Sequence, residues 1–257
     1  MASLIIVTTA VGVSTPLVHR ALPKLPSGGQ IALELGSMED AGSGSTVWPA
    51  AAAFCRWLTE KSDEICGSRV LELGSGTGGV GIFAAGLGAK RVLLTDGGPP
   101  GVRSLAERNI ELNRDHFAAD TSIGVEKLLW GDGEALPEGR FDWAIGSDVS
   151  YHCFPLAYTV RELLLGDEPP RVVLCDQPRY SEGVNLLDRF HDLASGMGLK
   201  FVPLAQFQEP HYPSDQEVRV EVYEVAVDAD ADPVAAQAFV DQLVATGKTR
   251  TNPRLII

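Results

Sequence analysis

The stretch from Val70 to Asp96, VLELGSGTGGVGIFAAGLGAKRVLLTD, constrains the fold of this chain most strongly. It has the pattern of an apolar strand, a glycine turn, a helix of small residues, a second apolar strand and a carboxylate. Gly74, Gly76 and Gly79 fit the spacing G-x-G-x-x-G. Glycines let the backbone approach a ligand, and the N-terminus of a helix presents unpaired N–H groups to it. The stretch therefore predicts a ligand site, in which Asp96 accepts hydrogen bonds from ribose hydroxyls.

The alternation of strands and helices continues along the chain. Helices expected over 79–87, 100–113, 155–165 and 182–197 alternate with the strand-like segments RVLEL, RVLLTD, VEKLLW, FDWAIGS and RVVLCD. Parallel strands need crossover helices, so this order predicts an α/β, Rossmann-like, doubly wound sheet of seven mostly parallel strands. The last two strands, LKFVPLAQF and EVRVEVYEV, are joined by QEPHYPSDQ without a helix. They are expected to form an antiparallel C-terminal hairpin at one edge.

Three regions are expected along the chain. Residues 1–60 hold two strand-like segments, SLIIVTT and QIALELG, which predict an N-terminal β extension, then a Gly/Ser-rich loop and a helix. That helix, PAAAAFCRWLTE, is expected to begin at Pro49 with Thr46 as its cap. Residues 61–228 form the core, and residues 229–257 form a terminal helix, closed by Gly247, and a polar tail.

Charge and composition argue against several classes of function. A net charge of -13 and the absence of a Lys/Arg cluster disfavour nucleic acid as a partner, whereas acidity suits a basic protein partner or solubility alone. No apolar run reaches the about 18 residues that span a bilayer, and the opening segment lacks the basic region of a signal peptide. The four cysteines lack a C-x-x-C pairing, which indicates reduced structural thiols, no metal site and a cytoplasmic protein. The lack of a long apolar run predicts no membrane partner.

The glycine pattern alone fits a nicotinamide dinucleotide as well as other adenosine cofactors. Three observations argue against the nicotinamide. Asp132 follows the strand-like LLWG, where it is placed to meet an adenine edge, and Glu72 lies in the first strand beside the glycine loop. The chain also contains no Tyr-x-x-x-Lys for short-chain hydride chemistry. The antiparallel terminal hairpin points the same way.

These segments resemble a known family, the seven-β-strand S-adenosylmethionine methyltransferases. LELGSGTGGVGIFAA, LLTD, LLWGD, AIGSDVSYH and the terminal hairpin carry the likeness, which runs over about residues 29–225. The chain is most similar to the branch that contains the lysine methyltransferases of chaperones, calmodulin and elongation factors. STVWPAAAAFCRWL and the Asp-x-x-Tyr of SDVSY are the most specific parts. The chain departs from that branch after Tyr151, where a second carboxylate or bulky apolar residue often follows, and in the loop DGGPP.

The resemblance implies that S-adenosylmethionine is the cofactor. In that family the glycine loop passes over the methionine part, an acid holds the ribose, and a tryptophan flanks the adenine. The residues of this chain that match are Trp48, Glu72, Gly74, Ser75, Gly76, Asp96, Trp130 and Ser147. Packing in the core is the alternative role for the two tryptophans.

The segment FDWAIGS delivers Asp148 and Tyr151 to the carboxyl ends of the strands, where ligands of open α/β sheets gather. A lysine has a pKa of about 10.4, so its neutral form costs about 4 to 5 kcal/mol near pH 7, and a lone carboxylate increases this cost. Asp148 is therefore expected to bind and orient the ammonium, while the sulfonium charge and a low-dielectric pocket favour the free amine. Tyr151 is expected to pack or hydrogen-bond at the same channel. The alternative roles are a helix cap for Asp148 and core packing for Tyr151.

Two further segments lie near these residues. CDQPRYSEG ends the next strand, so Asp176, Gln177, Arg179 and Tyr180 are candidates for shaping the target channel, and His152 adjoins Tyr151. The sequence thus predicts a monomeric, metal-free methyltransferase that acts on a lysine of a protein substrate. A non-catalytic binding or chaperone-like module is the main alternative, and methylation of another residue type or of a small molecule also stays open.

Overall fold

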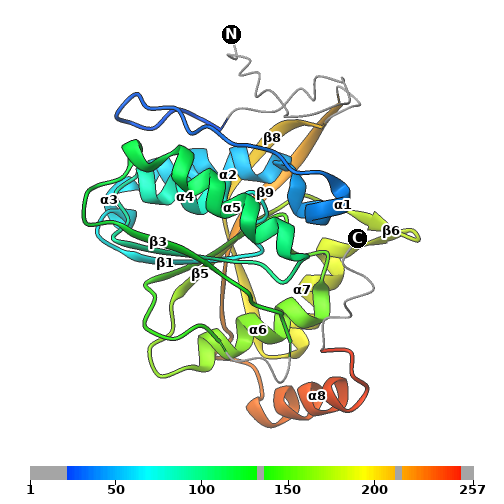
Figure 1. Ribbon diagram of the computed structural model, residues 1–257. Coiled ribbons are helices and arrows are strands. Elements are labelled where there is room, and N and C mark those ends of the chain that lie inside the picture. The colour runs from blue at the N-terminus through cyan, green and yellow to red at the C-terminus, as the bar shows by residue number, and fades with distance from the viewer. Residues whose placement is uncertain (1–21, 132–135, 212–215, 250–257) are drawn as a thin grey trace.

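The computed structural model describes residues 22–131, 136–211 and 216–249, and its main feature is a seven-stranded sheet (Figure 1). The strand order is β3-β2-β1-β4-β5-β9-β8. The first five strands of this order run parallel, β9 is antiparallel to β5, and β8 is antiparallel to β9. The predicted mostly parallel sheet and C-terminal hairpin are confirmed. The bounds are β1 Arg69–Leu73, β2 Arg91–Thr95, β3 Ser122–Glu126, β4 Trp143–Ser147, β5 Arg171–Asp176, β8 Leu199–His211 and β9 Gln216–Val227.

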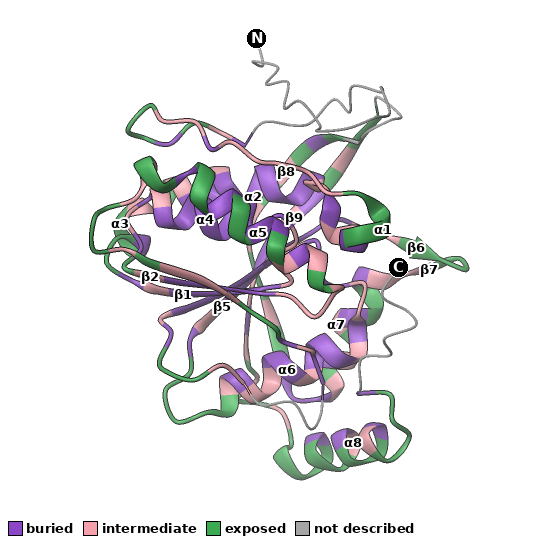
Figure 2. Cartoon of the chain, in the orientation of Figure 1, coloured by how far each residue is buried: buried purple, intermediate pink, exposed green. Residues whose placement is uncertain are grey.

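Helices cover both faces of the sheet, as a doubly wound fold requires (Figure 1). One face carries α2 Pro49–Glu60, α4 Gly79–Gly86 and α5 Pro100–Leu112, and the other carries α6 Cys153–Leu165, α7 Leu186–Gly196 and α8 Pro233–Ala245. Alternate strand residues point to opposite faces, so Val70 joins one core and Leu71 the other. The helices that cover the sheet are instead buried on the face toward the sheet and exposed on the opposite face (Figure 2).

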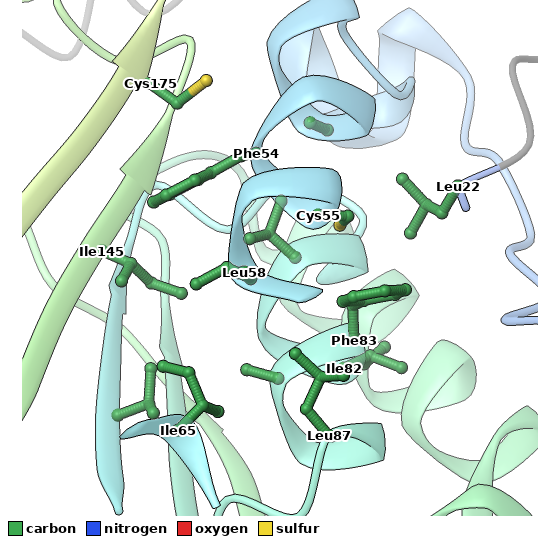
Figure 3. Close-up of a cluster of buried hydrophobic side chains, with 14 of the residues drawn as sticks. Leu22, Phe54, Cys55, Leu58, Ile65, Ile82, Phe83, Leu87, Ile145 and Cys175 are labelled. Atoms are coloured by element: carbon green, nitrogen blue, oxygen red, sulfur yellow. The ribbon is translucent and has the colours of Figure 1, made fainter. Parts of the chain in front are cut away.

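The core between the sheet and α2 is built from aliphatic, alanine, cysteine and aromatic side chains (Figure 3). Phe54 and Leu58 of α2 meet Ile145 of β4, and all three are fully buried. Burial of each such side chain contributes about 1.5 to 3 kcal/mol. Cys55 and Cys175 lie in the same core, and burial raises the pKa of both thiols. They pack as reduced apolar side chains, as the sequence predicted.

The expected strand over residues 30–36 is wrong, because side-chain amides replace a partner strand. The Asn113 side chain of the loop after α5 accepts from Ala32 N at 2.9 Å and donates to Ala32 O at 2.7 Å. Asn109 of α5 makes the same pair of bonds with Glu34, at 2.6 and 3.1 Å. The segment therefore has its backbone groups satisfied without belonging to a sheet. The other strand-like segment, SLIIVTT, lies outside the described residues.

The Gly/Ser-rich segment before α2 also differs from expectation. It forms two short helices, α1 Met38–Ala41 and the 3-10 helix η1 Gly42–Ser45. The expected capping role of Thr46 is wrong, because the N-cap of α2 is Trp48, which makes no side-chain capping bond. Pro49 at the first helical position has no N–H that needs a cap, which removes part of the requirement.

Three later boundaries also move. The strand expected over 125–130 ends at Glu126, within β3. A small hairpin, β6 Tyr180–Ser181 and β7 Val184–Asn185, occupies the first residues of the helix expected from Glu182, because Glu182 and Gly183 both have positive φ, as a two-residue hairpin turn requires. Most of QEPHYPSDQ continues the β8–β9 ladder, which extends to the pair His211 and Gln216.

The remaining short helices are α3 Ser62–Ile65 and η2 Arg114–His116. The terminal helix α8 ends before Gly247, whose φ of 67° fits the predicted closing glycine. No helix in the described part of the chain has the length and apolar character needed to cross a membrane.

Candidate active site

A pocket opens at the carboxyl ends of β1, β2 and β4, where the strand order reverses between β1 and β4. This is the position at which open α/β sheets bind ligands. Segments before α2, after β1, after β2 and after β4 contribute to its lining. All ten residues predicted to bind the cofactor or to act in catalysis lie in this lining: Trp48, Glu72, Gly74, Ser75, Gly76, Asp96, Trp130, Ser147, Asp148 and Tyr151. The channel candidates Asp176, Gln177, Arg179 and Tyr180 do not. Asp132, the expected partner of an adenine edge, lies outside the described residues.

The glycine loop after β1 is crowded by its neighbours at Gly74 and Gly76. Gly74 and Gly76 have φ values of 67° and 51°, a region that favours glycine. A Cβ on Gly74 would lie 2.9 Å from both Trp130 and Val149, and one on Gly76 would lie 3.2 Å from the backbone oxygen of Gly44. The loop is thus fixed by close approach of its neighbours and leaves its backbone along the pocket.

Asp96, after β2, fixes the loops on both sides of it. One carboxylate oxygen accepts from Gly76 N at 2.9 Å and the other accepts from Gly98 N at 2.7 Å. Burial raises the pKa of Asp96, and these two N–H donors oppose that effect. Each oxygen keeps a further lone pair that can accept from a ligand hydroxyl.

Glu72 braces β1 against α4. Its carboxyl group is buried and accepts from Gly81 N at 2.9 Å, in the first turns of the helix. Burial raises the pKa of Glu72 to about 8, and the bond from Gly81 only partly offsets this. Glu72 is therefore mainly protonated at neutral pH, although it lines the pocket.

Two serine hydroxyls in the pocket lining are buried without a partner among the described residues. These are Ser75 Oγ in the glycine loop and Ser147 Oγ at the end of β4. A buried polar atom left unsatisfied costs about 1 to 3 kcal/mol, so such atoms usually meet a ligand or water. Together with the glycine loop and Asp96, they fit a cofactor that carries hydroxyl, amine and carboxylate groups.

Asp148, at the turn after β4, is closed off by its neighbours. Arg179 donates to both of its oxygens at 2.8 Å, and Gln177 Nε2 donates to Oδ2 at 2.8 Å. Only 1% of the Asp148 side chain is exposed, against 26% of the Arg179 side chain. The residue also has a φ of 59°, which is uncommon for a residue other than glycine. The alternative role of a helix cap is wrong, because the N-cap of α6 is His152.

The sequence that forms this fold and pocket is similar to the sequences of known proteins. A family model described as lysine methyltransferase matches residues 29–192. This chain belongs to the lysine methyltransferase family. Protein N-lysine methyltransferase METTL21A of Danio rerio is 32% identical over 183 residues, which cover 70% of this chain and 76% of that protein. EEF1A lysine methyltransferase 3 of Xenopus tropicalis is 33% identical over 145 residues, or 55% and 61% of the two chains. Calmodulin-lysine N-methyltransferase of Arabidopsis thaliana is 29% identical over 161 residues, or 60% and 51%.

Membership confirms the resemblance inferred from the sequence. The chain is an S-adenosylmethionine-dependent protein-lysine methyltransferase, as predicted in preference to a nicotinamide enzyme. The predicted residues of the glycine loop and the Asp-x-x-Tyr segment fall within the matched range.

In this lysine methyltransferase, Asp176 at the end of β5 fixes the turn that carries Asp148 and Tyr151. Its Oδ1 accepts from Val149 N at 2.8 Å and Ser150 N at 3.0 Å, and its Oδ2 accepts from the Tyr223 hydroxyl at 2.7 Å. Burial raises the pKa of Asp176 to about 6, while these donors oppose the rise. Asp176 is therefore held within the scaffold of the turn.

Sequence reasoning missed how the segment before α2 closes the site. Trp48 Nε1 donates to Ser43 O at 3.0 Å, and the Tyr151 hydroxyl is hydrogen-bonded to the Ser43 side chain. The guanidinium carbon of Arg179 lies 4.4 Å from the centroid of the Trp48 ring. The Gly/Ser-rich segment before α2 predicted a loop, but no residue pattern in it indicated contact with Tyr151.

His152 completes the pocket wall. Its ring packs edge-on against Trp130, with centroids 5.8 Å apart, and lies 4.5 Å from the ring of Tyr151. Burial lowers the pKa of His152, which favours the neutral imidazole. Tyr180, by contrast, is 72% exposed and does not line the pocket.

Proposed function

We propose that methyl transfer takes place in this pocket, with the cofactor on the glycine-loop side and the lysine entering beside Asp148 and Tyr151. The observation that carries the proposal is the convergence of the ten predicted cofactor and catalytic residues on one pocket, whose lining also contains two serine hydroxyls without a partner among the described residues. A structural glycine turn alone would not place unsatisfied hydroxyls at the carboxyl ends of the strands.

The residues divide into those that hold the cofactor and those that receive the amine. Gly74 and Gly76 allow the cofactor to approach the backbone, and Asp96 accepts from its ribose hydroxyls. Ser75 and Ser147 supply further hydrogen bonds, while Trp48, Glu72 and Trp130 complete the walls. When bound, the cofactor supplies a sulfonium methyl group, and the electrons of the broken S–C bond return to sulfur as the C–N bond forms.

Asp148 and Tyr151 orient the acceptor at the opposite end. The amine must shed its proton before it attacks, which costs about 4 to 5 kcal/mol for an ordinary lysine near pH 7. Tyr151 is largely buried, and burial raises its pKa, so its phenol stays protonated and its ring excludes water from the amine. Positioning and water exclusion account for much of the rate in such in-line displacements.

For the substrate we propose a protein whose target lysine lies in basic surroundings, because the net charge of this chain is -13. The name of one relative makes EEF1A the first protein to try. We further propose that the enzyme is a cytoplasmic monomer that needs neither nucleic acid nor a membrane nor a metal. Light scattering at micromolar concentration tests the monomer.

Radiolabelling tests the proposed site. The protein is incubated with tritiated S-adenosylmethionine and a cell lysate, and calorimetry measures its affinity for S-adenosylhomocysteine. We expect micromolar-range binding, labelled lysines in mass spectra, and loss of labelling in Asp148→Ala with binding largely kept. Unchanged labelling in Asp148→Ala removes that residue from the mechanism. Binding without labelling by the unmodified protein supports the non-catalytic module instead.

A further inference from the structure

The Asp148 carboxylate is not available as a free anion. Its two oxygens accept three hydrogen bonds, two from Arg179 and one from Gln177, all at 2.8 Å. With 1% of the side chain exposed, an incoming ammonium has no open face of the carboxylate to meet. A bidentate arginine also neutralises the charge of its partner.

Arg179 is itself fixed from a second direction. Its guanidinium lies 4.4 Å from the centroid of the Trp48 ring, within the range of a cation–π contact. Trp48 is held in turn by its bond to Ser43 O, and the Ser43 side chain is bonded to Tyr151. Arg179 therefore joins the segment before α2 to the turn after β4 and lies beside the acceptor end of the pocket.

This arrangement changes the electrostatics that a lysine meets. A bare Asp148 would stabilise the ammonium and raise the pKa of the lysine, which opposes attack by the free amine. The paired Asp148 and Arg179 carry no net charge together, and the guanidinium disfavours a second cation nearby.

We propose that Arg179 is a positioning residue that neutralises Asp148, so that the acceptor lysine enters beside a closed ion pair and reacts at a lower pH than it would beside a free carboxylate. The proposal rests on the proposed function of this pocket. It departs from the ammonium-binding role predicted for Asp148 from the sequence, because it assigns the cation that binds Asp148 to the protein itself.

Other titratable groups face the pair, but they are the same in the variants compared below. Tyr151 in the turn after β4 and Asp176 of β5 interact electrostatically with Arg179, and Cys175 of β5 interacts with Asp148. Asp96 after β2 interacts with Tyr151. A difference between variants in the pH dependence of labelling therefore reports the charge at position 179.

The test compares Arg179→Gln, which removes the charge, with Arg179→Lys, which keeps it. Initial rates of labelling of the strongest acceptor in the lysate are measured from pH 7 to 10 at subsaturating acceptor. Arg171→Gln is the matched control, because Arg171 also stacks on a tryptophan, at 4.8 Å from Trp143, and pairs with carboxylates, but at the opposite end of β5.

We expect Arg179→Gln to move the midpoint of the rise in rate upward by about one pH unit, which lowers the rate about tenfold near pH 7 and less at pH 10. Arg179→Lys and Arg171→Gln are expected to keep the original midpoint, and calorimetry is expected to show retained binding of S-adenosylhomocysteine in all three. An unchanged midpoint in Arg179→Gln overturns the proposal.

A second outcome covers loss of folding. If Arg179→Gln no longer binds S-adenosylhomocysteine, the decision rests on Arg179→Lys, whose midpoint must match that of the unmodified protein, and a midpoint shifted upward overturns the proposal. Failure of the proposed function looks different, because the unmodified protein then labels no acceptor at any pH, and the inference fails with it.

Discussion

Glu72 shows how a residue in a ligand pocket can act mainly on stability. Its pKa is raised by burial to about 8, so between about pH 4.5 and 8 the folded protein keeps a proton that the unfolded chain has released. The free energy of unfolding should therefore fall as pH rises through this window, by at most about 1.4 kcal/mol per pH unit from this group. Glu72→Gln, which cannot ionise, is expected to lose this slope.

Thermal unfolding of both proteins at pH 5, 6, 7 and 8 measures the effect. The melting temperature of Glu72→Gln should rise relative to that of the unmodified protein at each step in pH. The slope from Asp176, whose pKa burial raises to about 6, is shared and cancels in the difference. Glu107→Gln, an exposed change on α5, is the control and should leave the slope as it is. Parallel curves for Glu72→Gln and the unmodified protein would refute the buried, protonated state.

Gly74 tests the close approach in the cofactor loop. Gly74→Ala combines a backbone with φ of 67° and a Cβ 2.9 Å from Trp130, so the loop or the tryptophan must move. We expect at least a tenfold loss of affinity for S-adenosylhomocysteine in calorimetry. Gly183→Ala has a similar backbone, with φ of 81°, but no atom within 4 Å of the new Cβ. Equal effects of the two substitutions on affinity would show that strain alone, and not contact with Trp130, matters.

For single residues, the sequence predicted which residues form the site better than it predicted the contacts between them. Glycine spacing, the acid after the second strand and the Asp-x-x-Tyr segment predicted residues that do share one pocket. The pairing of Asp148 with Arg179 was not predictable, because it depends on how the turns after β4 and β5 face each other. Asp148 and Arg179 are 31 residues apart in the sequence, so no local sequence pattern can indicate their contact.

Among the elements, the extended segment over residues 30–36 depends on two asparagines. Asn109 and Asn113 satisfy its backbone, and Asn109 Nδ2 also donates to Thr77 O of the glycine loop at 2.9 Å. Each backbone group that loses its partner in a buried site costs about 1 to 3 kcal/mol. We expect Asn113→Ala to expose the segment to limited proteolysis without changing ligand affinity.

Asn109→Ala is the informative contrast. It should expose the same segment and also weaken S-adenosylhomocysteine binding, because Thr77 O of the glycine loop loses the hydrogen bond from Asn109 Nδ2. Proteolysis followed by mass spectrometry, and calorimetry on the same samples, separate the two effects. If both variants bind the ligand like the unmodified protein, the segment does not support the cofactor loop.

The same elements show which sequence signals fail. QIALELG has Ile31, Leu33 and Leu35 at every second position, as a strand does, but only Ile31 is buried. The pattern does not record the identity of the hydrogen-bond partner. Helix α2 was predicted at its observed start, because Pro49 fixes the first turn. The β6–β7 hairpin was missed because its strands have two residues each, too few to show a period.

For the whole molecule, the sequence predicted the layers of the fold but not the order of the two hairpin strands at one edge of the sheet. Alternating strands and helices imply a doubly wound sheet, and a helix-free connection implies a hairpin. Which hairpin strand adjoins β5 depends on side-chain packing across the sheet. The structure places β9 there, where Tyr223 donates a hydrogen bond to Asp176 and so links β9 to the residue that holds the turn of Asp148 and Tyr151.

Ligand binding should stabilise this whole arrangement. A ligand that binds only the folded state at 100 times its dissociation constant adds about 2.7 kcal/mol to the free energy of unfolding. For a domain of about this size, we expect a rise of about 5 to 10 °C in melting temperature with S-adenosylhomocysteine. Differential scanning fluorimetry measures the shift, and nicotinamide adenine dinucleotide at the same concentration is the control. Asp96 and the glycine loop suit both ligands, so Ser75, Ser147 and Trp130 are proposed to select between them. A comparable shift in melting temperature with the dinucleotide would therefore contradict the assignment of the pocket.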